Sequence, residues 1–353
     1  MEKVGNGIKK MSKERLIVNA SNCHSGGGKT LINGFLKGAS EKIEILVYVD
    51  NRLEINYPIS KSIKIIRVNK LSRFLIGFKI KKILKKNDKI LYFGNLPPYL
   101  RFKCKNVMLQ LSSRFYVDSI SMKGFKFQQI IKIYFEKLYY RLFVKNVSHI
   151  IVQTSTMYKK LINSGFRKKI SIWAFDDLGS FSFEGNKVFK KEIGSFIYVA
   201  SLLPYKNHKR LLLAWNELKK QDINPKLYLT LDGNNNNLKK WIINFVSINK
   251  LNVCFLENIS RDNLISTYKK VETLIYPSFF EAYGLPLVEA KKYKLKIISS
   301  DLDYCWDFIE PDEFFNPYDV SSIARSVKRF LSIEKKLDKI YDPKEFFNKI
   351  INT

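Results

Sequence analysis

The sequence predicts an α/β protein built from two lobes, each with a doubly wound parallel sheet. At 353 residues the chain exceeds the size at which one hydrophobic core usually keeps growing, which favours two domains. Short β-branched runs alternate with amphipathic, Lys-rich segments, and this alternation is typical of parallel sheets covered by helices. Between Ala174 and Gly194 the pattern breaks into a stretch rich in Gly, Ser, Asp and Asn. We therefore expect one lobe over residues 1–175 and a second over 176–353.

The expected elements follow in chain order. Strands of the first lobe are predicted at Leu16–Ala20, Ile43–Val49, Ile63–Val68, Ile90–Phe93, Val107–Leu111 and His149–Gln153. Strands of the second lobe are predicted at Ser195–Ser201, Lys226–Asp232, Asn252–Leu256, Thr273–Tyr276 and Lys296–Ser299. Charged surface helices are expected from Ser321 to Ile351, and the last helix is a candidate to pack back on the first lobe. Ligands of such sheets bind beyond the carboxyl ends of the strands, which is where site residues are sought.

The charge of the chain is strongly positive and unevenly distributed. Sixty-two Lys and Arg residues face 32 Asp and Glu, giving a formal net charge of +30. Residues 1–175 carry 35 basic and 9 acidic side chains, or +26, whereas the remainder carries 27 and 23, or +4. A nucleic acid, an anionic membrane or a phosphate-bearing substrate would each account for this excess. A Lys-, Asn- and Ile-rich composition inherited from an AT-rich genome would also raise the total, but not the imbalance.

Cysteine use and hydropathy indicate an intracellular protein. The four cysteines, Cys23, Cys104, Cys254 and Cys305, show neither metal-binding nor disulfide-framework spacing. The first fifteen residues lack the apolar stretch of a secretion signal, and no run of about 18 apolar residues occurs. We expect a cytoplasmic protein without membrane-spanning segments.

The densest motif is Pro277–Ala290, which follows an expected strand and opens an expected helix. Gly284 allows a tight turn, and Pro286 suits the first turn of a helix. The free amides of that turn would bind an anion such as a diphosphate. Glu289, expected within the same first turn, could accept hydrogen bonds from vicinal hydroxyls, and Glu281 would face the other end of the ligand. The alternatives are a helix-dipole charge for Glu289 and a solvated loop acid for Glu281.

This block resembles the E-x7-E signature of retaining glycosyltransferases of the GT-B fold, family 4. A second stretch, Tyr198–His208, resembles the family segment G-R-L-x-P-x-K-N, and the resemblance implies that Lys206 contacts the donor diphosphate. The alternative for Lys206 is an exposed lysine at a helix start. The family commonly has Arg where this chain has Ser201, so one expected cation on the diphosphate is absent. The resemblance continues through Ile298–Asp303 and Phe314–Pro317.

A glycine-rich segment follows the first expected strand. Ser25–Thr30 resembles the loop with which the family's first lobe meets the donor, and Gly27 and Gly28 would let the backbone lie against phosphate and sugar. The rival interpretation is a P-loop, which would need glycine in place of Cys23. His24 borders this segment and is a further candidate to face the ligand.

Metal binding has one weak signal. Asp301 and Asp303 spell D-x-D, a metal-binding motif of the other glycosyltransferase fold, but loop capping is the favoured role. We expect no metal and no cofactor, with a UDP- or GDP-linked sugar as donor substrate.

Two basic, aromatic segments bear on the acceptor. Lys70–Lys86 has seven basic residues, no acid and apolar residues at mostly helical spacing, which is typical of a helix on an anionic membrane. Phe125–Lys145 has a similar mixture, and its apolar face could instead belong to the core of the lobe. No nucleic-acid-binding motif accompanies the charge, so we expect no nucleic-acid partner.

The resemblance implies two Rossmann-like lobes with a cleft between them and transfer of a sugar with retention at the anomeric carbon. Glu281 and Lys206 are the expected catalytic residues. Gly27, Gly28, Lys206, Gly284, Leu285 and Glu289 are the expected donor-binding residues. The expected acceptor is a saccharide, or one linked to a polyprenyl diphosphate, met on the inner face of the cell membrane during synthesis of cell-surface polysaccharide. The alternatives are a P-loop-like nucleotide-binding protein and a non-catalytic protein that binds sugar nucleotides or docks on membranes.

Overall fold

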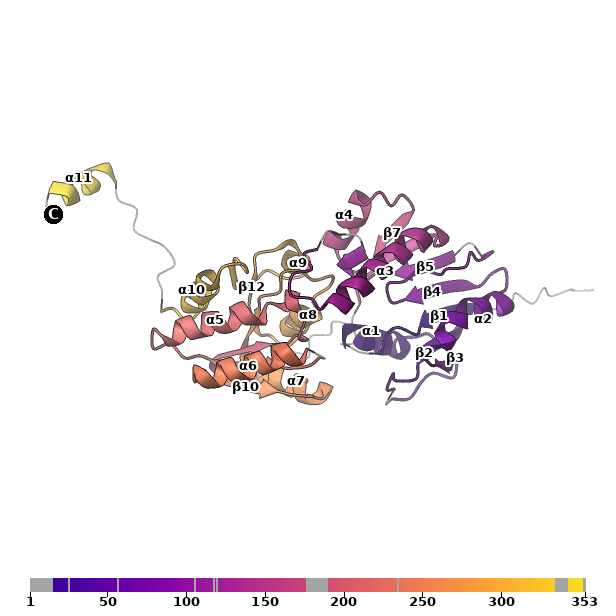
Figure 1. The fold of residues 1–353 in the computed structure, drawn as a ribbon, viewed down its shortest axis with the longest axis horizontal. Coiled ribbons are helices and arrows are strands. Elements are labelled where there is room, and N and C mark those ends of the chain that lie inside the picture. The colour runs from indigo at the N-terminus through magenta and orange to yellow at the C-terminus, as the bar shows by residue number, and fades with distance from the viewer. Residues whose placement is uncertain are drawn as a thin grey trace, which may run out of the picture. The chain divides into compact units, whose positions relative to one another are not determined.

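The structure is a computed structural model that describes residues 15–24, 26–55, 57–104, 106–116, 118, 120–175, 190–233, 235–333 and 342–351. The chain divides into two compact units (Figure 1). The first comprises residues 1–187 and 280–292, and the second comprises 188–279 and 293–353. Most of the expected boundary stretch, residues 176–189, lies outside the described residues.

The first unit is built on a seven-stranded parallel sheet in the order β3-β2-β1-β4-β5-β6-β7. Its strands are β1 (Arg15–Ala20), β2 (Glu44–Asp50), β3 (Ile63–Val68), β4 (Lys89–Phe93), β5 (Asn106–Gln110), β6 (His149–Val152) and β7 (Lys169–Ile172). Six of them match the predicted strands to within a few residues. The order reverses between β1 and β4, which is the switch point where ligands bind doubly wound sheets.

Among the described residues of the first unit there are five α-helices and three short 3₁₀ helices. The α-helices are α1 (Gly26–Lys37), α2 (Ile76–Ile83), α3 (Phe127–Phe143), α4 (Ser155–Asn163) and α8 (Leu285–Lys292), and the 3₁₀ helices are η1 (Ser72–Leu75), η2 (Arg114–Tyr116) and η3 (Val144–Asn146). Side chains of α2, α3 and α4 meet in one core cluster over the sheet, including Ile76, Tyr140 and Leu161. These three helices therefore cover the same face of the sheet.

The second unit repeats the architecture with six parallel strands in the order β10-β9-β8-β11-β12-β13. The strands are β8 (Glu192–Tyr198), β9 (Lys226–Thr230), β10 (Val253–Leu256), β11 (Val271–Tyr276), β12 (Lys296–Ser300) and β13 (Glu313–Phe315). The α-helices are α5 (His208–Lys219), α6 (Asn236–Ile248), α7 (Arg261–Lys270), α9 (Asp303–Trp306), α10 (Val320–Phe330) and α11 (Pro343–Ile351), with the 3₁₀ helix η4 (Pro204–Lys206) after β8. Helices α5 and α10 lie side by side (Figure 1). Two doubly wound parallel sheets, as predicted from the sequence, are thus confirmed.

The central strands are apolar on both faces because helices cover both sides of a parallel sheet. The last three residues of β8, Phe196, Ile197 and Tyr198, are completely buried. Trp215 of α5 packs edge-on against Phe196, with their ring centroids 5.5 Å apart. Its indole N–H donates to the carbonyl of Pro225 at 3.0 Å, so the polar atom of this large side chain is satisfied inside the core. None of the described helices has the length and apolar composition needed to cross a bilayer.

Candidate functional site

Lys206 lies in the second unit, in the turn that follows β8. Its side chain is buried, with 9% of the residue exposed. The Tyr198 hydroxyl donates to the Lys206 carbonyl at 2.5 Å, which fixes the turn to the end of the strand. The ammonium nitrogen lies 5.3 Å from the ring centroid of Tyr205 and 5.9 Å from that of Tyr276, within reach of both aromatic faces. The alternative of an exposed surface lysine is therefore wrong.

Asn207 links three loops of the second unit and was missed in the sequence analysis. Its backbone is left-handed, with φ of 59°, a conformation that asparagine tolerates better than most residues. Its side-chain amide donates to the carbonyls of Pro277 at 3.1 Å and Pro317 at 2.8 Å. A backbone bond from Phe279 N–H to the Tyr205 carbonyl, 2.9 Å long, adds to this link. The signal that could have found it is an asparagine directly after a short turn beginning with Pro204.

His208 begins α5 and is buried, with 2% of the residue exposed. Burial, and secondarily the charge of Lys206, lowers the pKa of this imidazole to about 3. Within the described part of the chain, neither ring nitrogen has a hydrogen-bond partner. The ring packs instead against Tyr198, at a centroid distance of 5.1 Å. His208 is therefore neutral at pH 7 and belongs to the packing beneath Lys206.

We expect His208→Phe to reduce the loss of stability that the protein undergoes as the pH falls below neutrality. The pKa of the imidazole is lower in the folded chain than the value of about 6.5 in the unfolded chain, so the unfolded chain binds more protons between these two values. The free energy of unfolding therefore falls as pH falls below 6.5, by about 2 kcal/mol from this group at pH 5. Urea midpoints at pH 7 and pH 5 measure the effect. An equal loss in wild type and variant would contradict it.

Ser201, the position of the absent family Arg, lies in the same loop after β8. It is half-buried, and its carbonyl accepts a bond from Leu203 N–H at 2.7 Å. The neighbouring Ala200 is fixed through both its N–H and its carbonyl by the Thr230 hydroxyl of β9, at 2.9 and 3.0 Å. The Ser201 hydroxyl thus stands where the family has a guanidinium, and the hydrogen bonds of the neighbouring Ala200 fix the backbone there.

In the first unit, the N-termini of α1 and α8 lie against each other. A Cβ atom on Gly27 would approach Leu285 Cδ1 to 3.2 Å, so glycine allows this close packing. Gly26 precedes it with a left-handed φ of 55°, and Gly28 packs over Cys23. The starts of the two helices thus lie close to each other through Gly27 and the Leu285 side chain, and the N–H groups of a helix start favour an anion. The structure thus brings Gly27 to Leu285, with Gly28 next to it in α1, and their role in binding a donor stays a prediction.

Glu281 and Glu289 flank the start of α8, and both are buried, at 9% and 3% exposure. Gly284, with φ of 74°, turns the chain between them, and a Cβ there would lie 3.0 Å from Leu287. The prediction that Glu289 falls in the first helical turn is wrong: α8 begins at Leu285, so Glu289 starts the second turn. Burial also excludes a solvated loop acid at Glu281 and a surface dipole charge at Glu289.

Residues of the first unit that the sequence analysis missed hold the segment before α8. The Thr154 hydroxyl donates to the Ala282 carbonyl at 3.3 Å while capping α4 through Met157 N–H. The Arg114 guanidinium lies 5.5 Å from the ring centroid of Phe280. Only the capping role of Thr154, before a Ser-Thr helix start, could have been foreseen from the sequence.

His24 lies at the end of β1 beside an acidic and basic pair. Two hydrogen bonds of 2.8 Å from the Arg52 guanidinium hold the pKa of the Asp50 carboxyl well below its usual range. His24 Nδ1 is 3.9 Å from this carboxylate, too far for a hydrogen bond. Burial and the charge of Arg52 lower the pKa of the imidazole. His24 is thus a neutral, partly exposed group at the carboxyl edge of the sheet.

The P-loop interpretation gains no support from this region. Gly26, Gly27 and Gly28 form the first turn of a helix rather than a loop. The Lys29 ammonium pairs with Glu54 at 2.6 Å on an exposed surface. Cys23, where a P-loop has glycine, is buried, and burial raises the pKa of its thiol to about 12.

The two residues of the D-x-D motif, Asp301 and Asp303, lie at the start of α9. Asp301 accepts a bond from the Trp306 indole at 3.1 Å, and Asp303 begins α9. Across the described residues, no three His, Cys, Asp or Glu side chains gather into a group that could hold a metal ion. That the reaction needs no metal stays a prediction.

Comparison with solved structures identifies the fold. The chain is similar to sucrose-phosphate synthase from Thermosynechococcus elongatus, with a TM-score of 0.67 at 13% identity over 91% of this chain and 90% of that one. It is also similar to Anabaena Alr3699/HepE, solved in complex with UDP and glucose, with a TM-score of 0.59 at 13% identity over 91% and 90%. Two doubly wound sheets with this similarity define a GT-B fold.

Sequence comparison finds similarity in the second half of the chain. Residues 183–344 match the family model "Glycosyl transferases group 1". The chain is 30% identical over 142 residues to the serotype-specific mannosyltransferase WbdA of Escherichia coli. That alignment covers 39% of this chain and 17% of the relative, so the chain spans about a sixth of that protein's length.

Proposed function

We propose that this protein transfers a sugar from a nucleotide-diphosphate donor to a hydroxyl group of an acceptor, with retention of the anomeric configuration. The observation that carries the proposal is the meeting of two helix starts at Gly27 and Leu285, with Glu289 buried one turn into α8. Converging amides suit a diphosphate, and a buried carboxylate suits the vicinal hydroxyls of a ribose.

In the proposed reaction, the bond between the anomeric carbon and the diphosphate oxygen breaks as the acceptor oxygen attacks from the same face. The nucleoside diphosphate departs with the bonding electron pair, and the proton of the acceptor hydroxyl passes to the departing diphosphate oxygen on the same face. Negative charge grows on the departing diphosphate, and fixed positive groups stabilise it without reorganising. We assign this role to the Lys206 ammonium and to the amides near Gly27, Gly28 and Leu285. Glu281 would position the sugar.

The acceptor we propose is a saccharide or a polyprenyl-diphosphate-linked saccharide of a cell-surface polysaccharide. Similarity to a serotype-specific mannosyltransferase supports a hexosyltransferase of this kind. A neighbour solved with UDP and glucose supports a UDP- or GDP-linked sugar as donor. The +26 charge of residues 1–175 supports a place on the inner face of an anionic membrane, with the protein otherwise in the cytoplasm.

A thermal-shift screen of UDP- and GDP-sugars tests the donor site. A ligand that binds only the folded protein, at a hundred times its Kd, stabilises it by about 2.7 kcal/mol, which raises Tm by several degrees. We expect one sugar nucleotide to give this shift and Glu289→Ala to abolish it. Glu310→Ala, which removes an exposed acid of the second unit, should keep the shift. The absence of any shift in wild type would remove the basis of the proposal.

A protein that binds the donor without transferring sugar is the second candidate, because Ser201 replaces the Arg of the family. Release of nucleoside diphosphate, measured on addition of acceptor, separates the two functions. A thermal shift with no release over any saccharide acceptor would favour the non-catalytic function.

A further inference from the structure

Helix α3 of the first unit exposes a long apolar face. It is packed through a single buried residue, Tyr140. Six large apolar side chains recur along the opposite face at spacings of three and four, and their exposure runs from 38% for Ile131 to 75% for Phe127. This exposed stripe consists of Phe127, Ile131, Tyr134, Phe135, Leu138 and Leu142. The stripe is therefore not part of the core of this unit, whereas Tyr140 of the same helix is.

A second apolar group lies on η1 and α2. The α2 patch consists of Leu71, Phe74, Leu75 and Phe78, each more than half exposed. It is held rigidly, because the Tyr99 hydroxyl donates to the Phe74 carbonyl at 2.7 Å and the Tyr99 ring packs edge-on against Phe78. A Cβ on Gly77 would clash with that ring at 2.9 Å, so glycine is required here. Tyr99 thus fixes the orientation of the patch.

The helices that carry the exposed stripe and the α2 patch cover the same face of the sheet, and both apolar groups lie on the outer sides of these helices. The buried residues of α2, Ile76 and Ile80, and Tyr140 of α3 belong to one core cluster over that face. On each helix the apolar surface residues lie opposite these buried ones. Figure 1 allows α2 and α3 to be followed across the sheet of the first unit. The two groups therefore form one surface of this unit.

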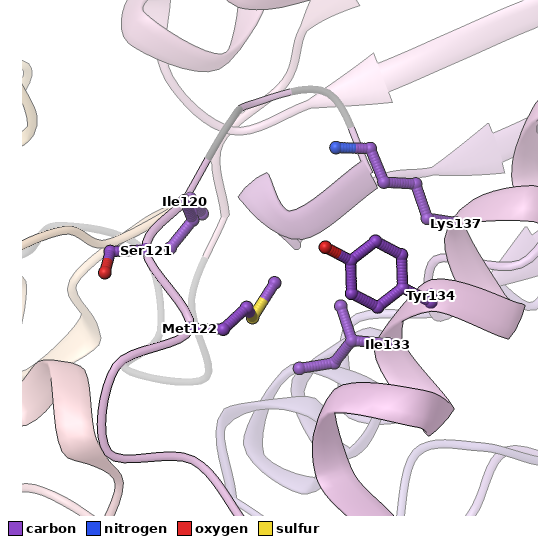
Figure 2. A pocket seen from close by; sticks show the side chains of 6 residues that line it. All are labelled: Ile120, Ser121, Met122, Ile133, Tyr134 and Lys137. Carbon is purple, nitrogen blue, oxygen red and sulfur yellow. The ribbon is translucent and has the colours of Figure 1, made fainter. Parts of the chain in front are cut away.

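A hollow of about 360 Å³ opens beside the exposed stripe. Its lining residues are Ile120, Ser121, Met122, Ile133, Tyr134 and Lys137. Figure 2 shows Met122 and Tyr134 on opposite sides of it, so Tyr134 belongs to both the stripe and the hollow. The surface is thus recessed as well as apolar, and a hydrocarbon chain lying there would meet mainly apolar atoms.

The charge around this surface is almost entirely positive. Between Glu54 and Asp88 there are ten basic residues and no acid, and residues 119–147 hold six basic side chains and only Glu136 as an acid. Beyond the α2 patch, Lys82 is exposed near the end of α2, and Lys85 is exposed just after the helix ends. Protein interfaces are depleted in lysine, whereas interfacial helices pair an apolar face with Lys and Arg that reach lipid phosphates.

We infer that the exposed stripe and the α2 patch dock this protein on an anionic lipid bilayer. The apolar side chains enter the boundary between headgroups and hydrocarbon, and the lysines contact the lipid phosphates. The inference goes beyond sugar transfer, because lipid binding needs neither donor nor acceptor. It places both helices at the bilayer and thereby orients the first unit on the surface where a lipid-linked acceptor would be found.

Sedimentation of the full chain with vesicles tests the inference. Vesicles of equal parts phosphatidylglycerol and phosphatidylcholine should bind the protein, and vesicles of phosphatidylcholine alone should bind far less. The Phe135→Ser/Leu138→Ser variant should bind the mixed vesicles more weakly, by on the order of a hundredfold. Lys82→Gln/Lys85→Gln should lose roughly thirtyfold, since each lysine near the surface contributes about 1 kcal/mol, or about a fivefold factor.

Matched controls come from the second unit. Ile193→Ser/Ile248→Ser removes two isoleucines that are about four-fifths exposed, and Lys220→Gln/Lys240→Gln removes two exposed lysines. Both should bind vesicles as wild type does, and urea unfolding verifies that all variants fold. Equal binding by the stripe variant and its control would overturn the inference. So would light scattering that shows a dimer of this chain dissociating in the stripe variant, because the stripe would then be covered by a second copy.

Discussion

Replacing Lys206 by methionine is expected to lower kcat/KM for sugar transfer by about 100- to 1000-fold. Removing one fixed group that stabilises charge in a transition state typically costs about 2.7–4 kcal/mol. The position magnifies this cost, because Lys206 is buried, and a charge shielded from water acts on a departing diphosphate more strongly. Methionine is unbranched like lysine and only one atom shorter, so the substitution removes the charge and keeps most of the packing of the side chain. Initial rates with the donor found by thermal shift measure the effect.

Lys209 supplies the matched control for this substitution. It lies three residues further along, is exposed, and places its ammonium 4.9 Å from the ring centroid of Trp241. Lys209→Met should transfer sugar at close to the wild-type rate. Activity of Lys206→Met within about threefold of that control would show that the ammonium does not act on the leaving group, even if donor still bound.

Replacing Trp215 by alanine is expected to destabilise the second unit by about 3–5 kcal/mol. Truncation of a buried aromatic side chain loses its transfer free energy and leaves a cavity. Trp215 is 1% exposed, packs against Phe196 and donates to the Pro225 carbonyl, which would lose its partner in the variant. The urea midpoint should fall accordingly.

Trp306→Ala provides the comparison within the same unit. Trp306 is 48% exposed, so its removal vacates little buried space, although its bond to Asp301 is lost. The expected cost is below about 1.5 kcal/mol. Similar losses from both substitutions would mean that Trp215 does not contribute to the core as its burial indicates.

Most of the fold could be predicted from the sequence because buried parallel strands leave continuous β-branched runs. The runs at Ile90–Phe93 and Lys296–Ser299 match β4 and β12 to within one residue. Two edge strands were missed, namely β7 (Lys169–Ile172) and β13 (Glu313–Phe315). An edge strand is partly exposed and short, so its composition carries less of the apolar signal.

The sequence indicated which residues belong to the candidate site, but not which contacts position them. The resemblance of the motifs pointed to Lys206, Glu281 and Glu289. All three side chains are buried, so none of them is an exposed surface charge. Contacts between distant segments could not be foreseen, among them the bond from Thr154 to Ala282 across 128 positions of chain. The first residue of a helix cannot be predicted exactly from the sequence. For this reason Glu289 was expected in the first turn of α8 but lies in the second.

The amide of Asn207, bonded to the carbonyls of Pro277 and Pro317, joins the loops that leave β8, β11 and β13. A displacement of the backbone in one of these loops should therefore displace the other two as well. A change in what this unit binds is therefore expected to come from side chains that project from the joined loops. Substitutions that move their main chain would disturb every contact at once.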